Sequence, residues 1–170
     1  MSKKKRVLFM GSKSLGLRVL QEIHRLSPDT LIGAVTVDDC SDTRTKLTDF
    51  QSFSDEHKVE LHVARNRKHS EHLIQELKPD LCFVVGWYWL ISDTVLDALP
   101  LGFIGIHNSL LPKFRGGSPL IWPIINGEKE AGFSFFSLTS GMDEGRIWVQ
   151  QRIPIGERDY ISSILEKIET

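Results

Sequence analysis

One segment of the sequence combines a histidine with an irregular loop, and it is the most unusual stretch of the chain. His107 ends a short apolar run, Phe103–His107, that is typical of a buried strand. The loop behind it is rich in backbone donors, and Pro112, Gly116 and Gly117 keep it out of a helix. A histidine in this place can act as a general acid or base near neutral pH, but a core histidine with one hydrogen bond gives the same pattern.

Asp143 is a second candidate for chemistry. It lies in the segment 139–145 between Gly141 and Gly145, so the backbone bends on both sides and presents the carboxylate from a loop. An ordinary surface acid in a turn is the alternative. Spacing along the chain does not establish a contact between Asp143 and His107.

A glycine-rich segment, 11–16, resembles the fingerprint of dinucleotide-binding proteins, but Lys13 occupies the position of the middle glycine. That glycine lets the backbone approach a pyrophosphate, so a nicotinamide cofactor is disfavoured even though Asp38 and Asp39 could mimic the ribose-binding acid. Two interpretations stay open. The segment is a plain strand-to-helix turn, or Lys13 and the helix amides receive an anionic group of a substrate.

Metal chemistry has little support in the sequence. His69 and His72 are three residues apart, but the chain has no HExxH pattern, and Cys40 and Cys82 are remote from them. We therefore expect no metal site. The run Trp87-Tyr88-Trp89 either stacks a flat ring or packs in the core.

Strand and helix signals alternate along the chain, and these elements must position the loops. The expected strands are 7–10, 31–37, 59–63, 81–85, 103–107, 131–138 and 146–155. The expected helices are 15–26, 43–57, 70–77 (with Ser70 as its cap), 93–99, 118–126 and 162–168. The alternation predicts an α/β fold, a Rossmann-like, mostly parallel sheet with helices on both faces. Ligands of such sheets bind beyond the carboxyl ends of the strands, so the loops at Gly11, Gly86 and His107 should face one crevice.

Composition bounds the remaining possibilities. The 170 residues are 41% hydrophobic and fit one domain, residues 1–170, and 21 basic against 22 acidic side chains disfavour nucleic acid as a general partner. No apolar run approaches the roughly 18 residues of a membrane-spanning helix, and the basic start of the chain lacks the features of a signal peptide. Two cysteines cannot build a secreted disulfide framework, so the cytoplasm is the expected compartment.

These motifs resemble those of the folate-dependent formyltransferases, which include methionyl-tRNA formyltransferase, glycinamide ribonucleotide transformylase, formyltetrahydrofolate hydrolases and sugar N-formyltransferases. The resemblance covers nearly the whole chain and is most specific between Val84 and Gly145. The family motif reads Asn-x-His-x-Ser-Leu-Leu-Pro-x-x-Arg-Gly and is followed by an aspartate between glycines. His107 and Asp143 fit both parts. The resemblance implies 10-formyltetrahydrofolate as the formyl donor and a primary amine as the acceptor.

The resemblance also implies roles for individual residues. Protonated His107 would stabilise the formyl oxygen and shuttle a proton, Asp143 would favour the charged imidazole, and Asn108 is a further catalytic candidate. The pteridine ring of the donor would lie against Gly86, Trp87, Tyr88, Trp89, Leu90 and Ile91, and against Ser140, Gly141 and Met142. The acceptor would be bordered by Ser12, Lys13, Ser109, Leu110, Leu111, Pro112, Arg115, Gly116 and Gly117.

One departure from the family affects catalysis directly. Gly105 stands where the family has its catalytic asparagine. Residues 105 and 107 face the same side of a strand, so Asn108 should point elsewhere unless the loop turns it back. Losing an oxyanion donor costs on the order of 10² to 10³ in rate. Asn108 or water would have to substitute, or the chain is a weak or inactive folate-binding module.

A second departure concerns length and the acceptor. The chain stops soon after the helix at Ser162 begins, which suggests a form shortened at its carboxy end. A tRNA acceptor is then less favoured, and the first loop lacks the pattern that holds a ribonucleotide phosphate. We expect an amino sugar linked to a nucleotide, or another small amine. A hydrolase that uses water as acceptor is an alternative, and the oligomeric state is left open.

Overall fold

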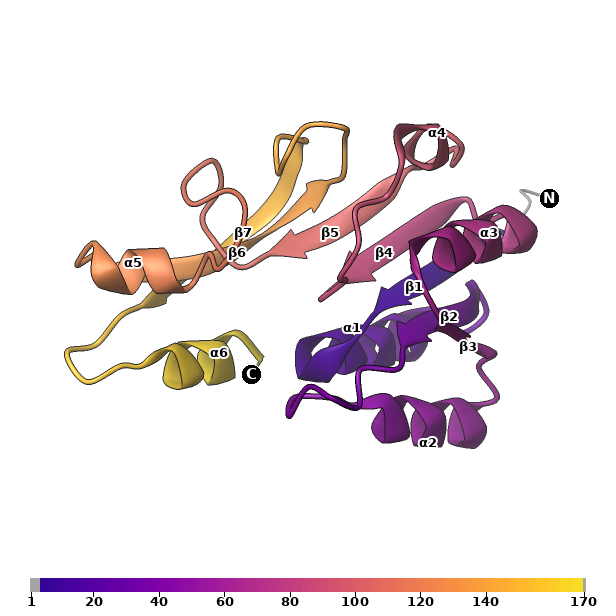
Figure 1. The fold of residues 1–170 in the computed structure, drawn as a ribbon, viewed down its shortest axis with the longest axis horizontal. Helices are drawn as coiled ribbons and strands as arrows, with labels where there is room; N and C mark the ends of the chain where they lie inside the picture. The colour runs from indigo at the N-terminus through magenta and orange to yellow at the C-terminus, as the bar shows by residue number, and fades with distance from the viewer. Residues whose placement is uncertain (1–3, 170) are drawn as a thin grey trace. The chain divides into compact units, whose positions relative to one another are not determined.

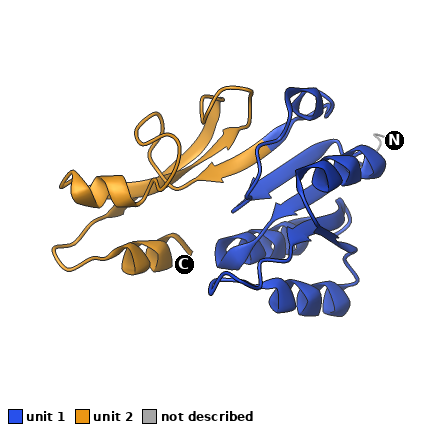
Figure 2. Cartoon of the chain, in the orientation of Figure 1, with its two compact units in different colours: residues 1–103 blue, residues 104–170 orange. Residues whose placement is uncertain are grey.

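The computed structural model describes residues 4–169 (Figure 1). The chain divides into two compact units, unit 1 with residues 1–103 and unit 2 with residues 104–170 (Figure 2). Within the described range, no helix combines the length and the apolar character needed to cross a membrane.

Unit 1 contains a parallel sheet whose central strand is completely buried. Its strands are β1 (Val7–Gly11), β2 (Leu31–Val37), β3 (Leu61–Ala64) and β4 (Leu81–Val85). They lie in the order β3-β2-β1-β4, and β1 pairs in parallel with both β2 and β4. Continuous apolar runs, rather than alternating ones, form these strands because helices cover both faces of the sheet.

The helices of unit 1 confirm the predicted fold class. They are α1 (Lys13–Leu26), α2 (Leu47–His57), α3 (Arg67–Leu77) and the short α4 (Asp93–Leu96). In Figure 1, α1 and α2 lie on one side of the parallel strands and α3 lies on the other. Right-handed crossovers produce this arrangement when the strand order reverses after β3. Unit 1 is therefore an α/β, Rossmann-like sheet.

Unit 2 is built on an antiparallel meander that begins at the boundary between the units. It comprises β5 (Phe103–His107), β6 (Glu130–Ser137) and β7 (Ile147–Pro154), and each strand pairs with the next. The short α5 (Ile121–Ile125) lies between β5 and β6, and α6 (Ile161–Glu169) packs on β6 and β7. The burial of Ile164 and Ile168 anchors α6.

The start of the second helix was predicted wrongly. It begins at Leu47 rather than at Thr43, because the residues before Leu47 form turns at Asp39 and Asp42. The carboxylate of Asp42 accepts a hydrogen bond from the backbone N–H of Arg44 at 2.9 Å. Aspartate side chains that bond to the backbone two residues ahead compete with helix formation.

The caps of two further helices also differ from the prediction. Asn66 caps α3, since its side-chain oxygen accepts from the N–H of His69 at 2.9 Å, and Ser70 lies inside the helix instead. The helix expected over 118–126 is shortened to α5, because Ser118 has a left-handed backbone with φ of 55°.

Candidate active site

His107 is buried at the end of β5, where its ring lies between two hydrogen-bond acceptors. Its Nε2 lies 2.8 Å from the carbonyl oxygen of Phe114. Since a carbonyl can only accept, Nε2 carries the proton of that bond. Its Nδ1 lies 3.5 Å from Oδ2 of Asp143. The ring therefore donates through Nε2 and turns its Nδ1 edge toward the Asp143 carboxylate.

Asp143 is held by the backbone as firmly as His107 is. Its Oδ2, the oxygen that faces His107, accepts a hydrogen bond from the N–H of Gly116 at 2.8 Å. The Asp143 loop closes tightly, since a Cβ at Gly145 would lie 1.7 Å from the carbonyl oxygen of Ser137. The contact that spacing alone could not establish is therefore formed within unit 2.

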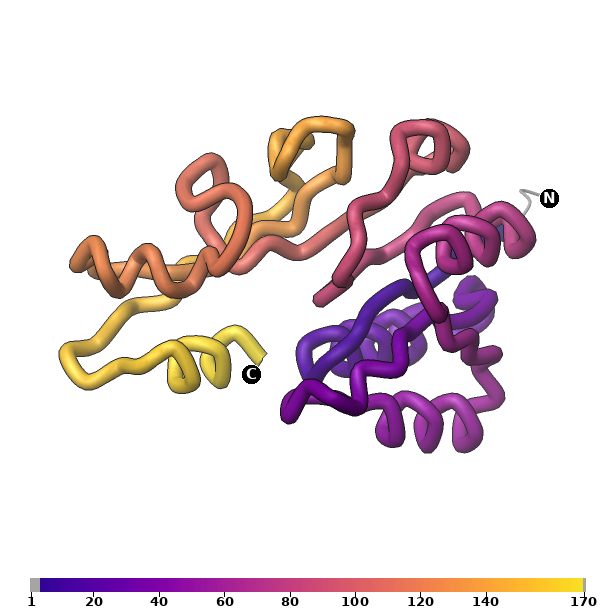
Figure 3. The backbone as a smooth tube through the Cα atoms, viewed as in Figure 1, coloured from indigo at the N-terminus to yellow at the C-terminus, as the bar shows by residue number. Residues whose placement is uncertain are grey.

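The segment after β5, residues 108–117, forms a loop between β5 and α5 (Figure 3). Phe114 and Gly116 both adopt left-handed backbone conformations, with φ of 57° and 85°. These turns bring the Phe114 carbonyl and the Gly116 N–H back to the His107 and Asp143 side chains. Because His107 is the predicted catalytic residue, we call this segment the catalytic loop.

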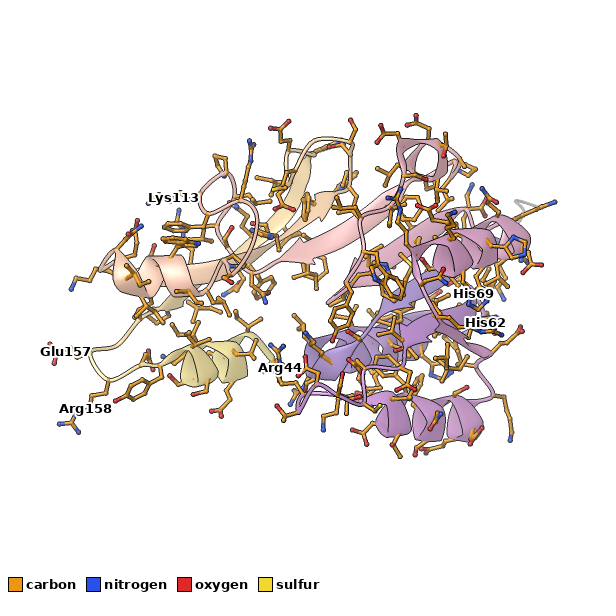
Figure 4. The ribbon with its side chains drawn as sticks, in the orientation of Figure 1. Arg44, His62, His69, Lys113, Glu157 and Arg158 are labelled. Atoms are coloured by element: carbon orange, nitrogen blue, oxygen red, sulfur yellow. The ribbon has the colours of Figure 1, made fainter. Side chains whose placement is uncertain are left out.

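The predicted acceptor-binding residues of the catalytic loop divide into buried and exposed groups. Ser109 and Leu111 are buried, and the Ser109 hydroxyl donates to the carbonyl of Lys113 at 2.7 Å. Pro112, Arg115 and Gly117 are exposed. Leu110 and Gly116 are half-buried. Lys113, which Figure 4 labels, forms an exposed ion pair with Glu128 at 3.1 Å.

At Gly105, where the family has its asparagine, a neighbouring side chain lies close to the backbone. A Cβ at Gly105 would lie 2.7 Å from Cδ2 of Leu138 and 3.5 Å from Cε1 of Phe136. Leu138 thus fills the space that a side chain at 105 would enter. Asn108 lies just beyond β5, and its Oδ1 is buried without a hydrogen-bond partner among residues 4–169. Leaving a polar atom unpaired in this way costs about 1–3 kcal/mol unless a ligand or water pairs with it.

In unit 1, the loops that follow β1 and β4 are tied together. A Cβ at Gly11 would lie 2.4 Å from the carbonyl oxygen of Val85, so only glycine permits this close approach. The Ser12 hydroxyl donates to the carbonyl of Gly86 at 2.6 Å instead of capping α1. Gly86 itself has a positive φ of 63°.

Lys13 belongs to a cluster of charged and aromatic side chains. Its Nζ lies 3.5 Å from Oδ2 of Asp42 and 4.7 Å from the centre of the Tyr88 ring. The Tyr88 hydroxyl donates to Asp39 at 3.0 Å. Burial, followed by this bond to a carboxylate, raises the pKa of Tyr88 to about 12. The hydrogen bonds from Arg44 hold the pKa of Asp42 below its ordinary value.

The Lys13 cluster borders a cavity of about 770 Å³ at the carboxyl ends of β2 and β3. Among its lining residues are Asp38, Asp39, Arg44, Arg65, Tyr88 and Trp89. Figure 4 labels Arg44 on the loop between β2 and α2. Sequence reasoning missed Arg44 and Arg65 as cavity residues. The signal was available, because both follow strands whose carboxyl ends form the ligand-binding edge of a parallel sheet.

The segments predicted to hold the pteridine ring expose apolar side chains in each unit. In unit 1, Tyr88 is 44% exposed and Leu90 is 78% exposed, while Trp87 packs edge-on against Trp89 at 5.4 Å. The Nε1 of Trp87 is buried without a hydrogen-bond partner among the described residues. Ile91 is half-buried. In unit 2, Met142 is 63% exposed, Ser140 is exposed and Gly141 is half-buried.

The histidines that might suggest a metal have other partners. His69 Nδ1 accepts from the N–H of Arg65 at 3.2 Å, and His72 lies 3.4 Å from Glu76. Within residues 4–169, no group of three or more His, Cys, Asp or Glu side chains could hold a metal ion.

Comparison with known proteins decides the family. The sequence profile of a family described as formyl transferase matches residues 5–170 of the chain. The chain belongs to the formyl transferase family. The methionyl-tRNA formyltransferase of Ehrlichia ruminantium (strain Welgevonden) is 30% identical over 168 residues, which are 96% of this chain and 55% of that protein. This formyl transferase chain spans about half the length of the first curated relatives it matches.

Solved structures place the chain in the formyl transferase fold. Glycinamide ribonucleotide transformylase 1 from Symbiobacterium toebii superimposes with a TM-score of 0.79 at 22% identity, covering 99% of this chain and 82% of that one. A formyltetrahydrofolate deformylase from Pseudomonas syringae pv. tomato str. DC3000 gives a TM-score of 0.79 at 19% identity, covering 98% of this chain and 56% of that one. At these identities the likeness establishes the fold alone.

Proposed function

We propose that this formyl transferase family member transfers a formyl group from 10-formyltetrahydrofolate to a primary amine. The observation that carries the proposal is the His107 ring, held between the Phe114 carbonyl and the Asp143 carboxylate. Family membership and a 30% identical relative named methionyl-tRNA formyltransferase support the reaction class. We further propose that residues 1–170 act as one catalytic domain.

In this mechanism, the amine nitrogen attacks the formyl carbon, and negative charge develops on the formyl oxygen. His107, as the imidazolium, stabilises that oxygen from its Nδ1 edge, because the Phe114 carbonyl occupies Nε2. Asp143, 3.5 Å from Nδ1, keeps the ring charged and oriented. The bond between the formyl carbon and the donor nitrogen then breaks. His107 relays the proton lost by the amine to the departing donor nitrogen, so one N–C bond forms and one breaks with no net change in protons. Asn108 is the proposed second donor to the oxygen.

We assign the folate donor to two segments, Gly86–Ile91 in unit 1 and Ser140–Met142 in unit 2. Exposed apolar side chains such as Leu90 and Met142 suit a flat ring system. The unpartnered Nε1 of Trp87 is a buried donor that an acceptor atom on a heteroaromatic ring would satisfy.

We propose an amino sugar linked to a nucleotide, or another small amine, as the acceptor. Lys13 and Ser12 in unit 1, and Arg115 and Gly117 in unit 2, supply cationic and backbone groups suited to an anionic substituent. The buried Ser109 and Leu111 shape the catalytic loop instead of touching the acceptor. A tRNA acceptor remains the alternative that the name of the Ehrlichia relative favours.

A hydrolase that releases formate is the second candidate. The fold matches that of a protein described as a formyltetrahydrofolate deformylase. Gly105, with Leu138 against it, favours a third possibility, a folate-binding module with little turnover. We propose the cytoplasm as the compartment, because Cys40 and Cys82 are both free thiols.

The test is turnover of 10-formyltetrahydrofolate by the full chain, with and without a panel of amines that includes nucleotide-linked amino sugars. Amine-dependent formation of tetrahydrofolate that His107→Ala abolishes would support the transferase. Formate release without an amine would support the hydrolase. Folate binding with no turnover would overturn the catalytic proposal.

A further inference from the structure

Two side chains outside the proposed mechanism lie in one row with His107. In the antiparallel sheet of unit 2, His107 of β5 pairs with Ser134 of β6, and Ser134 pairs with Gln150 of β7. Directly paired residues point to the same face of a sheet. Ser134 and Gln150 therefore share the face from which His107 projects.

The hydroxyl of Ser134 bonds to the catalytic loop in both directions. It donates to the carbonyl of Ser109 at 2.7 Å and accepts from the N–H of Leu111 at 3.1 Å. It also accepts from Nε2 of Gln150 at 2.9 Å, and the same amide donates to the carbonyl of Leu111 at 2.8 Å. One donated and two accepted bonds fill the capacity of a hydroxyl, and Ser134 is completely buried.

The backbone of β6 is shaped to receive this loop. A Cβ at Gly132 would lie 2.6 Å from Cδ2 of Leu110, so the absence of a side chain there lets the loop rest on the strand. Within the loop, the Ser109 hydroxyl donates to the carbonyl of Lys113, the residue before Phe114. Hydrogen bonds thus tie Gln150 and Ser134 to the loop backbone at Ser109 and Leu111. The Ser109 hydroxyl ties that part of the loop to the carbonyl of Lys113, one residue before the Phe114 carbonyl that holds His107 Nε2.

We infer that Ser134 and Gln150 are positioning residues for His107. They fix the first half of the catalytic loop, and the loop in turn fixes the Phe114 carbonyl against Nε2. The left-handed conformation of Phe114 needs such support, because unusual backbone geometry persists only where its surroundings over-determine it. The inference rests on the proposed function, in which the orientation of His107 sets the rate of formyl transfer.

The test compares Gln150→Leu with Gln151→Leu in the full chain. Gln151 is the next residue of β7. It is exposed, and its amide donates to the carbonyl of Arg152 at 3.3 Å. We expect Gln150→Leu to lower kcat for 10-formyltetrahydrofolate turnover about tenfold with little change in KM, as a misplaced catalytic group does. Gln151→Leu should leave both parameters unchanged.

Imidazole ¹⁵N NMR of the substrate-free protein provides a second readout. We expect Gln150→Leu and Ser134→Ala to shift the Nε2–H resonance of His107 and to speed its exchange with solvent. Ser134→Thr, which keeps the hydroxyl, should retain most of the wild-type signal. Because Gln150 lies at an exposed position, its variant tests the inference even where Ser134→Ala fails to fold.

Two outcomes would overturn the inference. One is a His107 resonance in Gln150→Leu that matches the wild type. The other is a lowered melting temperature with unchanged kcat per folded molecule, which marks a purely structural role. A wild-type chain that shows no turnover refutes the proposed function instead, and the NMR comparison then still decides whether the two residues position His107.

Discussion

His107 in unit 2 and Lys13 in unit 1 differ in the groups that surround them: backbone groups around His107 and side chains around Lys13. His107 and Asp143 are held by a backbone carbonyl and a backbone N–H, those of Phe114 and Gly116. Among residues 4–169, Lys13 instead contacts side chains, the carboxylate of Asp42 and the ring of Tyr88. Backbone groups have no rotamers to change, so the first arrangement fixes geometry, whereas the second can adapt to a ligand.

Burial sharpens the contrast. His107 is buried, while the cluster around Lys13 borders an open cavity of about 770 Å³ and stays partly solvated. Ion pairs in contact with water contribute about 0–1 kcal/mol, so they can be rearranged at little cost. Fixed geometry suits a reacting group and adaptable charge suits binding. Changes at His107 and Asp143 should therefore lower kcat, and changes around Lys13 should raise KM.

His107→Ala should have the largest effect. Loss of a general acid–base group costs about 10² to 10⁴ in rate, so kcat should fall by that factor in the folate turnover assay. His72→Ala is the matched control, since that ring is exposed on α3 and pairs only with Glu76. Equal activity in the two variants would remove His107 from the mechanism.

Asp143→Asn should follow, with a loss of roughly 10² in kcat, because the amide oxygen can still accept from Gly116 but no longer carries charge. The control is Glu144→Gln, which removes the adjacent acid and its exposed ion pair with Arg115. A change confined to KM would mean that Asp143 binds substrate and does not charge the ring.

Gly105→Asn restores the family residue, and by itself it should lower stability, because the Leu138 side chain must move to make room. Its Cβ would enter the space of Leu138, and overpacking of this kind costs about 1–3 kcal/mol of unfolding free energy. Adding Leu138→Ala should recover stability relative to the single variant, as measured by thermal unfolding. If the new carboxamide supplies an oxyanion donor, kcat of the double variant should exceed that of Leu138→Ala alone.

Lys13→Met should change binding more than rate. It keeps the length of the side chain but removes the charge, and a hydrogen bond to a charged group contributes about 1.5–3 kcal/mol, so KM for an anionic acceptor should rise about tenfold or more. Lys46→Met, which removes an exposed ion pair with Asp49, controls for net charge. A drop in kcat at unchanged KM would contradict the assignment of binding to Lys13 and of catalysis to His107.

The predictable parts of the molecule are those whose structure follows from the pattern of apolar and polar side chains along the chain. Apolar runs located every strand to within a few residues, including the buried β1. Helix starts were less secure, because Asp42 and Asn66 compete for backbone N–H groups and the outcome depends on local geometry.

The candidate site divides in the same way. His107 and Asp143 could be selected from residue type and glycine spacing, and the structure brings them to 3.5 Å. Their backbone partners could not, because every residue has a carbonyl and an N–H, and only the folded loop decides which ones turn inward. The contact of Gln150 with the catalytic loop could not be predicted for another reason. In the sequence, Gln150 is one of several polar residues of an edge strand, and only its register with Ser134 reveals the contact.

Tyr88→Phe should have the smallest effect, and it tests the electrostatics around Lys13 directly. The pKa of Tyr88 is raised from an unfolded value near 10.0 to about 12, so the folded protein holds this proton more tightly than the unfolded chain does. Wild-type stability should therefore decline as the pH rises from about 10 to 12, and Tyr88→Phe should lack that part of the decline. Absorbance at alkaline pH should lose its step near pH 12 in this variant, whereas Tyr160→Phe should keep it. A Tyr88 that titrates near 10 would mean that its hydroxyl is neither shielded from water nor hydrogen-bonded to Asp39 in solution. The Tyr88 side chain would then be as free to rearrange as the charged side chains around Lys13.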